Sequence, residues 1–145
     1  MRTVTLRLLA PAIMVIAVIA GIGVSGCDAS ETDESLVVQQ GSRALAHFTV
    51  RQLQGLPQVE ITTPQSRGAK VQKGPTVRSV LDAAHADGVI VVRVDGRDPA
   101  QTLSAAELTN DVILDITKRH TLKLTGANLT LDRWVRDVTA LVVNP

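Results

Sequence analysis

The chain has 145 residues, of which 45% are hydrophobic and 20% are charged, and its formal net charge at pH 7 is +1. This length suits one modest domain, and a charge so close to zero argues against nucleic-acid binding, which needs a strongly basic face. Phe48 and Trp134 are the only aromatic residues, so a stacking platform of several rings is excluded. The single cysteine, Cys27, excludes an internal disulfide, a cysteine zinc cluster and a CxxC redox pair.

The first 26 residues have the order of parts of a secretory signal peptide. Arg2 and Arg7 form a positive start, and residues 8–24 follow as a run of 17 residues without a charge, 14 of them hydrophobic. The run is slightly long for a signal peptide and approaches the ~20 residues of a spanning helix, so an uncleaved single-pass anchor is the alternative.

The segment Val24-Ser25-Gly26-Cys27 resembles the lipobox of bacterial lipoproteins. The resemblance implies that cleavage occurs before Cys27 and that this residue carries a diacylglycerol thioether and a further acyl chain such as palmitate. A thiol suits the modification because its sulfur is a good nucleophile. Two or more acyl chains hold a protein stably in a bilayer, so we expect a lipid anchor in the cell membrane with the protein facing outside the cytoplasm.

A polar, acidic stretch, Asp28–Ser35, follows the cysteine. It predicts a flexible tether that begins at Cys27 and extends to residue 42, and a folded domain over residues 43–145. The apolar run Leu36–Val38 is compatible with the start of an edge strand, but the prediction leaves it in the tether.

The first part of the domain predicts a short helix, a strand and a loop. Thr49-Val50-Arg51-Gln52 fits a capping box, which predicts a helix over residues 49–54 that ends at Gly55. Polar and apolar residues alternate over residues 58–62, as in a half-buried strand. Residues 63–73 contain Pro, Gly and three cations with little pattern and are predicted to form a loop.

The rest of the domain predicts one longer helix and several strands. The helix runs from Thr76 to Gly88, because four apolar residues share one helical face: Val77, Val80, Leu81 and Ala84. Residues 89–94 form an interior strand before a turn at Asp95-Gly96, and Ser104–Glu107 fits a capping box for a single helical turn. Three more strands are predicted, at residues 111–116, 121–125 and 138–143. The fold class is therefore α+β, with a mixed sheet and short helices.

Six segments of the domain, taken in order, carry a resemblance to a known family: Phe48–Leu53 with Leu56-Pro57, Val59–Thr62, Gly74–Ala84, Val91–Gly96, Leu103–Leu108 and Arg133–Val142. They resemble the oxidoreductase molybdopterin-binding domain, the fold of sulfite-oxidase-type enzymes, over most of residues 47–143. The family holds molybdenum through a cysteine in the loop after the first strand. Here that loop, Thr63–Gly68, has no cysteine, and Cys27 lies far outside it. The resemblance therefore implies the scaffold rather than the redox chemistry.

Charged residues give one candidate binding site. Four cations lie within twelve residues, three of them in the loop where the family places its cofactor, and they predict anion binding: Arg67, Lys70, Lys73 and Arg78. Lys118-Arg119-His120 is a second basic cluster, interpreted as a solvated turn, with proximity to lipid headgroups as the alternative. His47, His85 and His120 are scattered without the spacing of metal ligands, and we predict no metal site and no catalytic residues.

The sequence thus predicts a membrane-anchored envelope lipoprotein whose domain is a non-catalytic binding or interaction module. We expect no cofactor, and the partner is an envelope protein or a small anionic ligand. The alternative is a molybdopterin-dependent oxidoreductase or an accessory subunit of one. A carrier for an apolar ligand is a third class, ranked last because about 100 residues leave little volume beyond a core.

Overall fold

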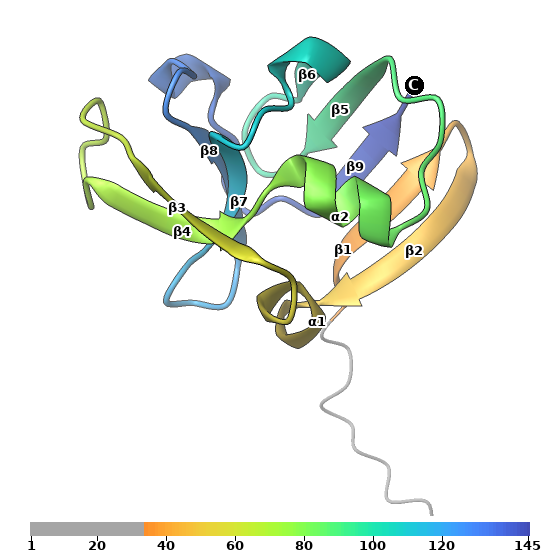
Figure 1. Ribbon diagram of the computed structural model, residues 1–145, viewed down its shortest axis with the longest axis horizontal. Coiled ribbons are helices and arrows are strands. Elements are labelled where there is room, and N and C mark those ends of the chain that lie inside the picture. The colour runs from red at the N-terminus through yellow and green to blue at the C-terminus, as the bar shows by residue number, and fades with distance from the viewer. Residues whose placement is uncertain (1–33) are drawn as a thin grey trace, which may run out of the picture.

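A mixed five-stranded sheet organises the chain in a computed structural model that describes residues 34–145 (Figure 1). Its strand order is β2-β1-β9-β5-β6, where β1 and β9 are parallel and the other neighbours antiparallel. The bounds are β1 Glu34–Gln40, β2 Arg43–Thr49, β5 Val91–Asp95, β6 Gln101–Ser104 and β9 Ala140–Val143. The predicted class, a mixed sheet with short helices, is confirmed. The predicted signal peptide, with Val24, Ser25, Gly26 and Cys27, lies outside the described residues.

Strand β1 stands where the sequence predicted part of the tether. It pairs with β2 on one side and with β9 on the other, and Leu36 and Val38 are fully buried. The folded domain therefore includes residues from 34 onward, and the predicted boundary at residue 43 is wrong. Its partner β9 lies about a hundred residues away in the chain, and local sequence patterns do not reveal a pairing of that range.

Two hairpins lie beside this sheet (Figure 1). One pairs β3 (Gln58–Thr62) with β4 (Val71–Pro75), and the other pairs β7 (Val112–Ile116) with β8 (Leu122–Gly126). They meet at Gly74, where a Cβ would lie 1.9 Å from the carbonyl oxygen of Leu114, so only glycine fits. The predicted loop over residues 63–73 ends at residue 70, because its last three residues belong to β4.

The helices begin where the sequence predicted them. Helix α1 (Val50–Gln54) has the capping box of Thr49 and Gln52, and α2 (Val77–Ala83) begins after Thr76, whose hydroxyl accepts from the Ser79 N–H at 3.0 Å. Single 3-10 turns cover Ala105–Glu107, as predicted, and Leu131–Arg133.

Helix α2 ends five residues before the predicted stop at Gly88. His85 takes a left-handed conformation with φ of 56°, its N–H bonds to the Asp82 carbonyl, and the Ala86 N–H bonds to the Leu81 carbonyl. This is a Schellman motif in which a histidine occupies the position usually taken by glycine.

The core lies between α2 and the five-stranded sheet, and α2 is drawn in front of that sheet in Figure 1. The predicted apolar face of the helix is buried in full. Helix and sheet side chains share one hydrophobic cluster that includes Leu36, Val38, Val77, Val80, Leu81, Val92, Val94 and Leu141.

Replacing Leu36 tests whether β1 belongs to the domain. Leu36→Ala removes a fully buried side chain from the centre of the core, and we expect it to lower the free energy of unfolding by about 2–5 kcal/mol. Gln39→Ala on the same strand, whose side chain is only partly buried, is the control and should have a much smaller effect. Urea denaturation measures both effects. A Leu36→Ala protein as stable as the native one would show that β1 belongs to the tether and not to the folded domain.

Candidate functional site

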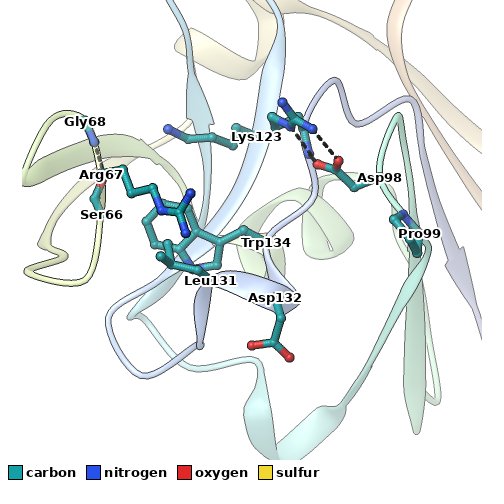
Figure 2. A pocket seen from close by; sticks show the side chains of 10 residues that line it. Ser66, Arg67, Gly68, Asp98, Pro99, Lys123, Leu131, Asp132 and Trp134 are labelled. Carbon is teal, nitrogen blue, oxygen red and sulfur yellow. Dashed lines mark hydrogen bonds and ion pairs between the residues drawn. The ribbon is translucent and has the colours of Figure 1, made fainter.

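An open groove of about 850 Å³ lies at one side of the two hairpins, beside Trp134 (Figure 2). We call it the Trp134 groove. Its lining comes from four separate segments: residues 66–68, residues 98–99, Lys123 of β8, and residues 131–136. Its volume lies in the range of small-molecule sites in proteins.

Close backbone contact holds two of these segments together. A Cβ on Gly96 would lie 2.6 Å from the Arg136 carbonyl oxygen, and the Arg97 N–H donates to that same oxygen at 2.8 Å. On the other side of this segment, the Leu124 N–H of β8 donates to the Val135 carbonyl at 2.8 Å. The turn after β5, the segment before β9 and strand β8 are thereby fixed side by side.

Asp98 and Arg136 form the strongest ion pair of the groove. The Asp98 carboxylate accepts from Arg136 Nε at 3.0 Å, from Nη2 at 2.8 Å and from the Arg136 backbone N–H at 2.8 Å. These bonds lower the pKa of Asp98 to about 2, first through the guanidinium side chain and then through the backbone N–H. Asp98 is therefore ionised at neutral pH and neutralises Arg136.

Trp134 forms the aromatic wall of the groove and is fixed on two sides. Its indole N–H donates to the Leu129 carbonyl at 3.2 Å, and Lys123 Nζ lies 5.6 Å from the centre of its ring. Lys123 also donates to Gln72 Oε1 at 3.0 Å and pairs with Asp115 at 3.4 Å. The lysine is thus held in place by a carboxylate, an amide and a cation–π contact.

Arg67 is the cation of the groove whose charge is free for a ligand. Within residues 34–145 it has no ion pair, and Figure 2 shows its side chain extending from its loop toward Trp134. The loop is ordered by its own bonds: Ser66 is buried, the Gly68 N–H donates to Ser66 Oγ at 3.2 Å, and Lys70 Nζ donates to the carbonyls of Pro64 and Ser66.

The four cations predicted as an anion site do not converge on one pocket in the described structure. Only Arg67 lines the groove. Lys70 closes its own loop, and Arg78 donates to the Leu108 carbonyl at 3.0 Å and the Ala105 carbonyl at 3.2 Å. Lys73 lies on β4, where its backbone N–H donates to Asp115.

The cations that line the groove with Trp134 are Lys123 and Arg136, which lie near it in the sequence, and Arg67, which comes from the distant β3–β4 loop. The sequence analysis does not single out Lys123 or Arg136, because nothing local shows that their side chains meet beside Trp134. The one available signal was Trp134 itself, the only tryptophan of the chain. Lys118-Arg119-His120, the second predicted cluster, forms the turn between β7 and β8, and two of its residues line a neighbouring pocket.

The three histidines considered in the sequence analysis lie in turns or on the surface of the domain. His85 ends α2, and His120 takes φ of 59° in the β7–β8 turn. His47 is exposed on β2. Among residues 34–145 no group of three or more His, Cys, Asp and Glu residues could hold a metal ion, and no helix there is long and apolar enough to cross a membrane.

Comparisons with known proteins do not assign the chain to a family. No protein-family model matches it, and no curated protein matches it significantly.

The Asp98–Arg136 pair predicts a pH dependence of stability. The pKa of Asp98 is lowered to about 2, so its contribution is fully present above the unfolded value near 4 and is lost as the pH falls through about 2. We expect Asp98→Ala to cost about 1–2 kcal/mol at pH 7, with the difference from the native protein shrinking between pH 4 and pH 2.

Urea denaturation at a series of pH values measures this difference. Asp87→Ala removes an exposed carboxylate that does not line the groove and is the control for lost charge. A difference for Asp98→Ala that stays constant from pH 7 to pH 2 would contradict the role of the ionised pair.

Proposed function

We propose that the chain is an envelope lipoprotein, anchored in the membrane by lipid on Cys27, whose domain binds a small organic anion without transforming it. The observation that carries the binding role is the Trp134 groove, where an aromatic wall faces an arginine that has no ion pair within the described residues. The anchoring role rests on the lipobox resemblance of residues 24–27.

The chemistry of the lining describes the ligand. Trp134, Leu131 and Pro99 offer apolar surface, and Leu131 is 37% exposed although it is a large apolar residue. Arg67 supplies an unpaired charge at one side, suited to bidentate contact with a carboxylate or phosphate. A ligand with a flat apolar part and one anionic group fits this arrangement best.

The carboxylates of the groove argue for binding rather than catalysis. Asp98 is held ionised by Arg136, and the pKa of Asp132 is also lowered, mainly by a hydrogen bond from Thr130. Figure 2 shows the Asp132 carboxylate directed away from Trp134. Neither group is poised to exchange a proton near neutral pH, so acid–base chemistry has no support from these two residues.

A molybdopterin-dependent oxidoreductase, or an accessory subunit of one, is the second candidate. It is favoured by the position of Ser66, Arg67 and Gly68: they follow β3, the place where the resembling family holds its cofactor, and they line the groove. A flat pterin and its phosphate match Trp134 and Arg67. The metal does not fit, because the only cysteine of the chain is Cys27 and no thiolate lines the groove. Stoichiometric molybdenum in the purified protein would establish this candidate instead.

The anchor is tested by replacing Cys27. We expect Cys27→Ala, expressed in a bacterial host, to accumulate as an uncleaved precursor and to lose incorporation of labelled palmitate, because no other thiol is present to receive lipid. Gel mobility and lipid labelling measure the two effects. Ser30→Ala, close to the site but outside the lipobox, should be processed normally, and unchanged labelling of Cys27→Ala would contradict the anchor.

Ligand binding is tested through Trp134, which is the only tryptophan in a chain without tyrosine, so that the intrinsic fluorescence reports on the groove alone. We expect phenyl phosphate to change this fluorescence in a saturable way and the uncharged benzyl alcohol to do so far more weakly. Arg67→Gln should weaken phenyl phosphate binding about tenfold, as expected for loss of one charge-assisted contact. Arg51→Gln, an exposed arginine of α1, is the matched control, and equal losses in both variants would contradict the site.

A further inference from the structure

A second pocket, of about 320 Å³, opens at the turn of the β7–β8 hairpin. Five of its eight lining residues are cations, and they come from four parts of the chain: Arg97, Lys118 and Arg119, Lys123, and Arg136. We call it the basic pocket. It shares Lys123 and Arg136 with the Trp134 groove, and the other three cations belong to it alone.

The hairpin turn that carries two of these cations is fixed by its own hydrogen bonds. The hydroxyls of Thr117 and Thr121 lie 2.8 Å apart, and the Thr117 N–H donates to the Thr121 carbonyl at 2.9 Å. His120 adopts a left-handed φ and its N–H donates to the Thr117 carbonyl at 2.9 Å. The two threonines also line the pocket, so hydroxyl groups stand beside its charges.

The charges of the pocket are only partly compensated. Lys123 is paired with Asp115, and Arg136 with Asp98. Arg97 has one long contact, 3.8 Å to Asp137, and both of these side chains are well exposed.

Lys118 and Arg119 are exposed and have no ion pair within the described residues. Three cations thus face a single carboxylate, Asp137. A doubly charged anion relieves this repulsion and matches guanidinium and hydroxyl donors, which is the donor set that binds phosphate.

We propose that the basic pocket binds a phosphate group, carried either by the headgroup of an anionic phospholipid or by a soluble phosphate compound. This proposal concerns a site apart from the Trp134 groove. Of the two possible sources of phosphate, only the phospholipid headgroup depends on the proposed anchor at Cys27. Seven residues lead from Cys27 to Glu34, a reach of at most about 25 Å. In Figure 1 the start of the described chain and the β7–β8 turn both lie at the lower edge of the molecule.

The test uses the isotopically labelled full chain and follows the backbone amide signals of residues 117–121 by NMR. In one arm the chain is held in non-ionic detergent and titrated with inorganic phosphate, with chloride at equal ionic strength as the reference. In the other arm it is embedded in nanodiscs of phosphatidylcholine, with or without phosphatidylglycerol. We expect saturable shifts of these signals with phosphate, with phosphatidylglycerol, or with both.

The variants decide whether the basic pocket is responsible. The double variant Lys118→Gln, Arg119→Gln should weaken the response at least about tenfold, because it removes two of the three weakly paired cations. The side chains of Lys118 and Arg119 take no part in the bonds that fix the turn, so we expect an unchanged melting temperature. Arg67→Gln should leave the response intact, because Arg67 lines only the other site.

The double variant Arg43→Gln, Arg51→Gln removes the same charge elsewhere on the domain and is the matched control. A response to phosphatidylglycerol alone identifies a lipid headgroup as the source, and a response to inorganic phosphate shows that a soluble compound suffices. The proposal is overturned if neither arm gives a saturable shift, or if the control variant weakens the response as much as the pocket variant. Loss of lipid labelling at Cys27 is measured separately and leaves the phosphate titration unaffected.

Discussion

The contact between Gly96 and Arg136 is the constraint on which both sites depend. The backbone of the turn after β5 lies so close to residues 135–136 that a Cβ at Gly96 would come within 2.7 Å of both a carbonyl oxygen and the Val135 side chain. The Arg97–Arg136 backbone bond and the three bonds from Arg136 to Asp98 then close the contact. Without it, neither Asp98 nor Arg97 has a fixed position beside β8.

This contact also explains why two sites of different chemistry stand next to each other. Lys123 and Arg136 form their common wall, and each is neutralised by its own carboxylate, Asp115 and Asp98. The character of each site is therefore set by the residues it does not share. Arg67 beside Trp134 gives a mostly apolar groove with one available charge, whereas the β7–β8 turn gives a pocket dominated by charge.

Local patterns predicted those elements whose cause is local. The capping box of Thr49 and Gln52 and the alternation in β3 involve neighbours in sequence, and α1 and β3 lie where they were predicted. Strand β1 was missed because its burial depends on β9, at the far end of the chain. The end of α2 was misplaced because the chain turns at a left-handed histidine, His85, and no local pattern distinguishes that residue from an ordinary helical one.

The sequence predicted single residues of the candidate sites but not their assembly, because local patterns do not show contacts between distant residues. A run of cations shows where positive charge is present, but not which of these side chains are already hydrogen-bonded within the fold. Lys70 and Arg78 donate to backbone carbonyls, which leaves Arg67 alone from that cluster at the groove. The sequence analysis interprets Lys118 and Arg119 as part of a solvated turn. In the structure they line a pocket together with Arg97, which the close approach at Gly96 places beside them.

The position of β1 changes what an anchor at Cys27 would do. With the domain starting at residue 34 instead of 43, the connection to the lipid shortens from about 58 Å to about 25 Å at full extension. Such an anchor would hold the start of the domain within about 25 Å of the bilayer. This reach would allow the β7–β8 turn to approach the layer, about one Debye length thick, in which the field of anionic lipids acts. Residues 28–33 carry three acids, Asp28, Glu31 and Asp33, which such a surface repels, whereas the β7–β8 turn carries cations, which it attracts. With such an anchor, the positive charge of the β7–β8 turn would favour an orientation in which this turn is the part of the domain nearest an anionic surface.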